Sequence, residues 1–113
     1  MRVVGVRVHS GLHLKSACTL LDEHTLLHLP ERIDLVPLRD AGLEAIAVEE
    51  PAGANVLALG RHVLVSAAAP RTADLVAARG HEPIAVGIGE FHKGDGALTC
   101  LSLRVPAVGQ WCA

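Results

Sequence analysis

The chain has 113 residues, of which half are apolar, and a formal net charge of −2 at pH 7. This length predicts one domain with one buried core. Lys and Arg are scattered singly and aromatic residues are almost absent, which argues against nucleic acid as a partner. No apolar run approaches the roughly 20 residues that span a bilayer, so we expect no membrane segment.

The first residues and the cysteines both bear on the cellular compartment. Residues 2–8 alternate small apolar residues with arginines, and they lack the continuous apolar region of a signal peptide. The three cysteines, Cys18, Cys100 and Cys112, are odd in number and form no C-x-x-C pair. We therefore expect a cytoplasmic protein with reduced thiols.

Most of the chain has the pattern of short strands. Runs rich in Val, Leu and Ile, bounded by turn residues, predict strands at about 2–8, 13–21, 25–29, 44–49, 54–59, 62–66, 82–88 and 97–105. Residues 70–79 predict a helix, because Pro70 stands at the start and Gly80 just past the end. Residues 31–41 end in the same way before Gly42, but Pro37 predicts that this helix is broken or shortened.

The chain also matches itself at a spacing of 38 residues. Without gaps, His24 falls on His62, Gly42 on Gly80, and Ile46-Ala47-Val48 on Ile84-Ala85-Val86. Each copy reads strand, tight turn, strand, helix, strand, with the turns at Asp22-Glu23 and Gly60-Arg61. Two ββαβ units with an extra strand at each end leave open sheet edges, which favours a fragment of a larger ring.

The histidines raise the question of a metal site. His9 with His13, and His24 with His28, are spaced i, i+4, which on a helix would suggest metal ligation. On extended chain the spacing spans roughly 13 Å, so neither pair can share an ion and we expect no metal. The simplest interpretation is solvated histidines at strand ends, which applies to His9, His24, His28, His62 and His81.

The glycine pair Gly87-x-Gly89 resembles part of a dinucleotide-binding loop. That loop requires a following helix whose N-terminus holds the phosphates. We expect a strand after Gly89 and therefore reject this interpretation.

Two segments could carry chemistry, residues 11–16 around His13 and residues 93–103 around Cys100. A lone cysteine in a strand is usually an inert core residue. A thiol with a nearby imidazole, however, is the pair that nucleophilic catalysis by cysteine requires. Glycines just before Cys100 would let the backbone approach a bound substrate closely.

These segments together resemble a known family. Leu12-His13-Leu14-Lys15-Ser16, Ala54-Asn55, Pro70-Arg71-Thr72 and the run from Asp95 to Arg104, in this order and spacing, are similar to bacterial dimethylarginine dimethylaminohydrolases. The resemblance covers Val3 to Arg104. It implies an α/β fold, the pentein propeller of five ββαβ modules, of which residues 1–113 would be the C-terminal part with about two blades and flanking strands.

The resemblance also implies an activity. Cys100 would be the nucleophile and His13 the acid/base in hydrolysis of N-methylated arginine to citrulline and methylamine or dimethylamine, through a covalent thiouronium intermediate. The backbone around Leu12 and Gly94 would line the guanidinium pocket. No metal or organic cofactor is implied, and the partner is a small guanidino substrate.

The resemblance is incomplete, and this leaves alternatives open. Family members are considerably longer, and their first half supplies the acidic group that orients the histidine and the groups that bind both ends of the substrate. The chain could thus be a non-catalytic fragment, or a module whose open edge strands join a separate N-terminal half or a second copy. Arginine deiminases and amidinotransferases share the fold and the Cys/His pair, so their activities remain alternatives.

Overall fold

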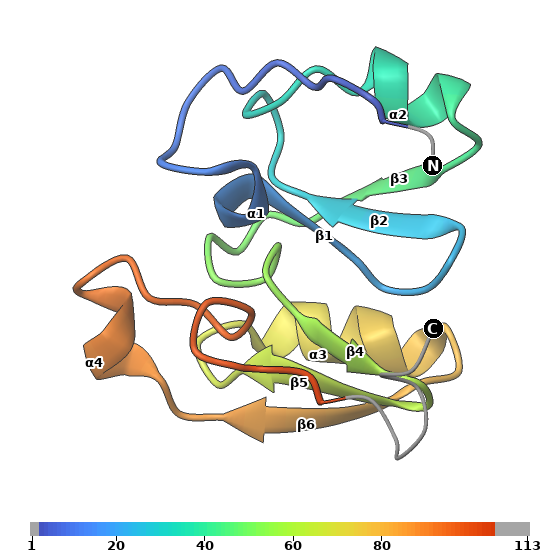
Figure 1. The fold of residues 1–113 in the computed structure, drawn as a ribbon. Helices are drawn as coiled ribbons and strands as arrows, with labels where there is room; N and C mark the ends of the chain where they lie inside the picture. Colours follow the sequence, from blue (N-terminus) through green and yellow to red (C-terminus); the bar gives the residue numbers. More distant parts are fainter. Residues whose placement is uncertain (1–2, 106–113) are drawn as a thin grey trace.

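The structure is a computed structural model that describes residues 3–105. It contains two consecutive ββαβ units, with the first above the second in Figure 1. The first unit comprises β1 (Cys18–Leu20), β2 (Thr25–His28), α2 (Val36–Asp40) and β3 (Glu44–Ala47), and the second β4 (Leu57–Leu59), β5 (His62–Ser66), α3 (Pro70–Ala78) and β6 (Glu82–Val86). Two short helices, α1 (Leu14–Ala17) and α4 (Gly89–His92), precede and follow these units. The predicted repeat of two ββαβ units is confirmed.

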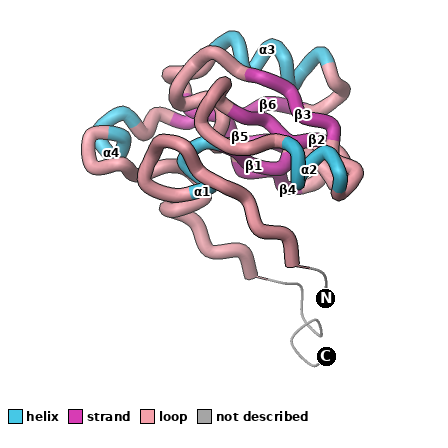
Figure 2. Tube along the Cα trace, turned by 90° about the horizontal axis from the view of Figure 1, so that it is seen from above, coloured by secondary structure: helices cyan, strands magenta, loops and turns pink. Residues whose placement is uncertain are grey.

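Each unit folds as a three-stranded sheet around a central strand. β2 pairs antiparallel with β1 and parallel with β3, and β5 pairs in the same way with β4 and β6. The parallel pair requires a crossover, which α2 and α3 provide. Seen from above in Figure 2, the strands gather in the middle, with the helices and loops around them.

Proline and glycine set the ends of the two crossover helices. α3 begins at Pro70 and is followed by Gly80, whose φ of 91° suits glycine. α2 carries Pro37 in its first turn and is followed by Gly42 with φ of 93°. Pro37 therefore starts a short helix and does not interrupt a longer one, because a first-turn N–H has no partner within a helix.

The two units differ in register by one residue. Thr25 pairs with Glu44, and His62 pairs with Glu82. Glu44 and Glu82 are 38 residues apart but Thr25 and His62 only 37, so the gap-free match of His24 with His62 is wrong by one residue. The reason is that the turn between β1 and β2, residues 21–24, is longer than the turn between β4 and β5, residues 60–61.

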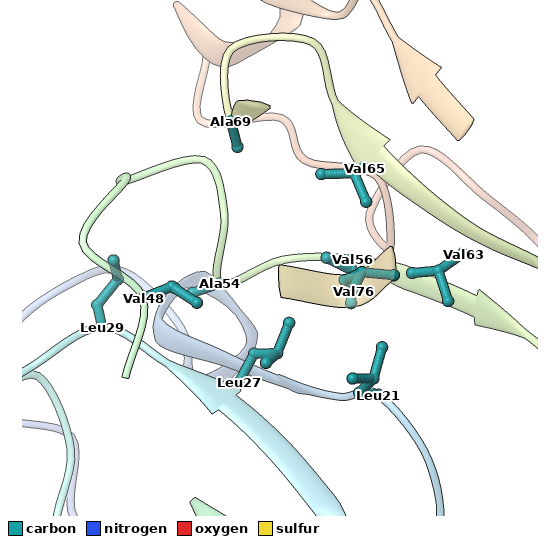
Figure 3. Packing of buried hydrophobic residues seen from close by; sticks show 10 residues of the cluster. All are labelled: Leu21, Leu27, Leu29, Val48, Ala54, Val56, Val63, Val65, Ala69 and Val76. Atoms are coloured by element: carbon teal, nitrogen blue, oxygen red, sulfur yellow. The ribbon is translucent and has the colours of Figure 1, made fainter. Parts of the chain in front are cut away.

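The main hydrophobic core lies between the two units. Leu21 and Leu27 of the first unit point toward Val56 and Val63 of the second, and all four are almost fully buried (Figure 3). Leu26, the neighbour of Leu27 on β2, belongs instead to a second cluster under α2, as expected from the alternation of side chains along a strand. β2 is therefore covered on both faces.

The central position of β2 corrects one prediction. His28 is only 6% exposed, and its Nδ1 lies 3.3 Å from the carbonyl oxygen of Leu29. His28 is thus buried and not a solvated strand end. His9, His24 and His62 are exposed as predicted, and His81 is partly buried.

The segments that flank the two units do not form the predicted strands. Residues 3–7 are irregular, and the first segment is joined to the fold by one antiparallel bridge between Val8 and Ile33. Within 13–21, a helical turn occupies residues 14–17 before β1. Residues 98–101 form a turn in which the N–H of Leu101 donates to the carbonyl of Ala97 at 3.0 Å. In the Cys100 turn, a local bond thus uses backbone groups that a strand would have offered to a neighbouring strand.

A helix follows Gly87-x-Gly89 where we expected a strand. α4 consists of only four residues, 89–92. A single turn provides too few aligned peptide dipoles and free N–H groups for a dinucleotide site. α1 and α4 lie toward the same end of the molecule, on the left in Figures 1 and 2, away from α2.

Candidate active site

His13 stands at the start of α1. Its backbone is extended, with φ of −139° and ψ of 162°, and its carbonyl accepts a hydrogen bond from the N–H of Ser16 at 3.0 Å. Its side chain makes no capping bond and is exposed. Leu12, directly before it, is 67% exposed. Both residues therefore present their side chains to solvent at the beginning of a single helical turn.

Cys100 lies in the turn of residues 98–101, and its side chain is exposed. The segment before it leaves α4 through a tight reversal. The N–H groups of Asp95 and Gly96 donate to the carbonyls of His92 and Phe91 at 3.1 and 2.8 Å, and Asp95 adopts a φ of 60°. This is a Schellman ending, in which a left-handed residue stops the helix.

Gly96 has no space for a side chain. A Cβ at this position would lie 2.9 Å from the carbonyl oxygen of Phe91, closer than real Cβ atoms come. Gly94, the other glycine of the reversal, is exposed, and its Cβ would have ordinary contact distances. We expected these glycines to let the backbone approach a substrate closely. The close approach is found at Gly96, but it is to the Phe91 carbonyl and allows the chain to reverse after α4.

Asn55 joins the two candidate segments. Its Nδ2 donates to the carbonyl oxygen of Lys15 and to Oγ1 of Thr99, both at 2.8 Å, and its Oδ1 accepts the N–H of Thr99 at 3.0 Å. Lys15 is two residues after His13, and Thr99 directly precedes Cys100. The structure therefore brings together two segments that are more than 80 residues apart in the sequence.

The backbone of Asn55 is itself held from β1. The hydroxyl of Thr19 donates to the carbonyl of Ala54 at 2.7 Å and accepts the N–H of Val56 at 3.0 Å. Ala54 and Val56 are almost fully buried in the core between the units. Between these two core residues, the Asn55 side chain points toward α1 and the Cys100 turn, to which it is hydrogen-bonded.

His92 holds the loop before Cys100. Its Nε2 lies 2.9 Å from Oγ of Ser66 at the end of β5, and its Nδ1 lies 3.0 Å from the carbonyl oxygen of Gly96. One ring nitrogen of a neutral imidazole donates and the other accepts. Since a carbonyl only accepts, Nδ1 donates to the carbonyl of Gly96; in the neutral imidazole, Nε2 then accepts from the Ser66 hydroxyl.

Cys18 differs from Cys100 in its surroundings. It is 5% exposed, and burial raises the pKa of its thiol. Its Sγ donates to the carbonyl of Leu14 at 3.6 Å. Cys18 therefore has the character of a core residue, while Cys100 is accessible. Cys112 lies outside the described residues.

An open, mainly apolar groove of about 950 Å³ runs beside the site. It is bordered by β1, β4, Lys15, Thr99 and the segment from Ser102 to Arg104. Neither His13 nor Cys100 lines this groove, so it adjoins the two reactive segments and does not contain their reactive side chains.

The sequence patterns did not identify the connecting residues. Asn55 belongs to the Ala54-Asn55 motif, which assigns it no role, and no pattern in the sequence indicates His92. A polar residue between the apolar Ala54 and Val56 was the available signal for Asn55, because a buried amide needs partners.

In the part of the chain that the structure describes, no cluster of three or more metal-ligating side chains occurs, and no helix is long and apolar enough to cross a membrane.

Comparison with known proteins agrees with the resemblance. No protein-family model matches the sequence. The N(G),N(G)-dimethylarginine dimethylaminohydrolase of Streptomyces coelicolor is 45% identical over 106 residues, which are 92% of this chain and 40% of that protein. The solved structure of the Pseudomonas aeruginosa enzyme, as a cysteine-to-serine variant complexed with citrulline, superposes with a TM-score of 0.76 at 30% identity, covering 88% of this chain and 39% of that one.

A more distant structure shares only the fold. The inosamine-phosphate amidinotransferase of Streptomyces griseus is 18% identical and has a TM-score of 0.76, covering 90% of this chain and 34% of that one. The chain thus spans about two fifths of the length of the curated relative with 45% identity. The chain therefore has the α/β fold of the pentein propellers, and it is similar in sequence and in fold to about two fifths of the length of these dimethylarginine dimethylaminohydrolases.

Proposed function

We propose that the chain carries the nucleophile and the acid/base of a cysteine-dependent hydrolase that converts N-methylated arginine to citrulline. The observation that carries this proposal is the Asn55 bridge, which joins the His13 segment to the Cys100 segment. The exposure of Cys100 beside the burial of Cys18 supports the same choice of nucleophile.

In this mechanism the Cys100 thiolate attacks the guanidinium carbon of the substrate. As the new C–S bond forms, His13 gives a proton to the methylated nitrogen, and the C–N bond breaks to release methylamine or dimethylamine. The product on the enzyme is a thiouronium. The cationic substrate favours the thiolate electrostatically, and no metal or cofactor takes part.

Hydrolysis then regenerates the thiolate. His13, now neutral, removes a proton from water, and the resulting hydroxide attacks the same carbon. The C–S bond breaks, citrulline leaves, and His13 is protonated again. Leu12, directly before His13, and Gly94, six residues before Cys100, would contribute backbone to the wall of the guanidinium pocket.

The test is covalent labelling with 2-chloroacetamidine, which places an amidinium next to a leaving group. Mass spectrometry after limited reaction should find label on Cys100 in preference to Cys18 and Cys112, and His13→Ala should slow the labelling. The proposed site would be contradicted if Cys100 reacted at the same rate as a small-molecule thiol and His13→Ala did not change that rate.

We also propose that a companion segment, the N-terminal half of a related chain, completes the site. The groove supports this, because the edge strands β1 and β4 both border it and its walls are mostly apolar. Leu20 on β1 and Leu103 both line the groove, and they are 50% and 88% exposed. A strand or apolar segment added at these edges would cover both.

Size-exclusion chromatography with light scattering tests the companion proposal. A separately expressed N-terminal half of the S. coelicolor relative, mixed with this chain, should give a 1:1 complex, and Leu20→Lys should prevent it. A chain that forms no complex and stays monomeric would leave the non-catalytic fragment as the better interpretation. Assays of the same complex with methylarginine, arginine and other guanidines as substrates distinguish hydrolysis of methylarginine from the deiminase and amidinotransferase activities.

A further inference from the structure

Asn55 is a buried amide whose hydrogen-bonding groups are used in an unusual way. It is 5% exposed, and its nitrogen and oxygen together make three hydrogen bonds. An amide buried without partners costs about 1–3 kcal/mol, so a buried asparagine is kept where its bonds are made. Here all three bonds go to residues remote in the sequence, in the segments of His13 and Cys100.

We propose that Asn55 is a positioning residue that sets the relative placement of Cys100 and His13, an inference that rests on the proposed function. Asn55 makes no hydrogen bond to either reactive side chain, both of which lie in the described part of the chain. Two of its three bonds are to main-chain atoms, the carbonyl of Lys15 and the N–H of Thr99. It therefore fixes the backbone on both sides and leaves the sulfur and the imidazole free to react.

The two segments need such a support because neither is rigid by itself. α1 has four residues, and so short a helix does not persist without tertiary contacts. The turn that carries Cys100 contains one backbone hydrogen bond, from Leu101 to Ala97. It is anchored further by the buried Leu98 and by the two bonds of Thr99 to Asn55. Removing the Asn55 amide would leave both segments without their common contact.

Asn55 can act as a support because its own backbone is fixed in the core. The Thr19 hydroxyl bonds the peptide groups on both sides of it, and Ala54 and Val56 are packed between the two units. A continuous series of contacts therefore runs from the core, through Asn55, to the two reactive segments.

The experiment measures the second-order rate of Cys100 alkylation by 2-chloroacetamidine in the full chain, by mass spectrometry. The variants are Asn55→Ala and Thr99→Val. Thr99→Val removes only the hydroxyl that accepts from Asn55, and it decides the question if Asn55→Ala does not fold. Thr99→Ser keeps the hydroxyl and should recover most of the rate. Thr25→Val is the matched control, because it removes another buried hydroxyl, at the opposite end of the β1–β2 hairpin.

Asn55→Ala should lower the rate at least about tenfold, since a misplacement of about 1 Å can cost roughly a hundredfold in a positioned site. The rate with neutral iodoacetamide should change less, because that reagent does not require the placed imidazole. In a His13→Ala background, Asn55→Ala should have little further effect, since residues that act as a unit are not additive.

A merely structural role predicts the opposite pattern. In that case Asn55→Ala and Thr25→Val would each change the labelling rate of Cys100 by the same factor with both reagents. The effects of Asn55→Ala and His13→Ala on the rate would then be additive. Selective labelling of wild-type Cys100 that persists in folded Asn55→Ala and Thr99→Val overturns the positioning role alone. Hydrogen exchange at the Thr99 amide reports whether its bond to Asn55 is formed. If this amide is protected in the wild type but Cys100 is not labelled selectively, the proposed function is overturned.

Discussion

Thr99 receives both ends of the Asn55 side-chain amide, its N–H bonding Oδ1 at 3.0 Å and its Oγ1 accepting from Nδ2 at 2.8 Å. Two bonds to one planar amide fix orientation as well as distance. Since Cys100 is the next residue, this pair ties the position of the thiol to the core strand that follows Ala54. It also makes the arrangement accessible to mutation at sites that take no part in the chemistry.

The chain should form citrulline only together with a companion half. Near-attack positioning can supply roughly 7–11 kcal/mol of barrier reduction, and we expect the companion to provide the groups that hold the substrate. A colorimetric citrulline assay on the mixture should detect turnover, which Cys100→Ser abolishes and His13→Ala lowers by about 10²–10⁴-fold. Full turnover by the 113-residue chain alone would show that it assembles a complete site without the companion.

Cys18 should be unreactive toward neutral alkylating agents while the chain is folded. Burial raises the pKa of its thiol, so at any given pH less thiolate is present than for an ordinary cysteine. Iodoacetamide at pH 8 should label Cys18 only after denaturant is added. Rapid labelling in buffer, at the rate of a small-molecule thiol, would mean that the segment around α1 opens frequently.

Glu50 should stabilise the fold in a pH-dependent way. Burial alone would raise its pKa, but hydrogen bonds from the N–H and hydroxyl of Thr72 and from the N–H of Arg71, with the Arg71 charge, outweigh this and lower the pKa. These are free donors in the first turn of α3, whose N-cap, Ala69, has no side chain to bond them.

The sign of the effect follows from the lower pKa in the folded chain. The carboxylate stabilises the fold above the unfolded pKa of about 4.3, and this stabilisation is lost as the pH falls through the lower folded pKa. Glu50→Gln should therefore reduce the free energy of unfolding at pH 7, by about 0.3–1 kcal/mol for a charge at a helix N-terminus, and the deficit should shrink below about pH 4. Denaturant unfolding at pH 7, 5 and 3 measures it, and a deficit that grows with acid would contradict the assignment.

Gly53 should not tolerate a methyl group. A Cβ there would lie 2.1 Å from Oγ1 of Thr72, so the side chain that bonds Glu50 would have to move. Gly53→Ala should destabilise the fold by about 1–3 kcal/mol, as overpacking does in a core. Gly87→Ala is the matched control, because no heavy atom lies within 4 Å of a Cβ there. Thermal unfolding compares the two, and equal melting temperatures would contradict the packing around Thr72.

Local patterns in the sequence determined the repeating part of the fold. Pro70 and Gly80 mark the helix between two strands because a first-turn N–H is dispensable and a left-handed terminus favours glycine. Gly42 in the same way marks the end of the helix of the first unit, but Pro37, which predicted a break within residues 31–41, lies in the first turn of that helix. His13 and Cys100 were identified through their resemblance to a family, because neither residue has a local pattern that separates it from an ordinary histidine or cysteine.

Tertiary structure decided the rest, because the deciding partners are far apart in the chain. Asn55 reaches Lys15 across 40 residues and Thr99 across 44, and no window of neighbouring residues contains such contacts. The same applies to His28, which is buried because β2 is covered on both faces, and to the turn at Cys100, where Thr99 bonds Asn55. Alternation and turn residues specify which segments can be extended, but whether a segment becomes a strand depends on where its backbone finds a partner.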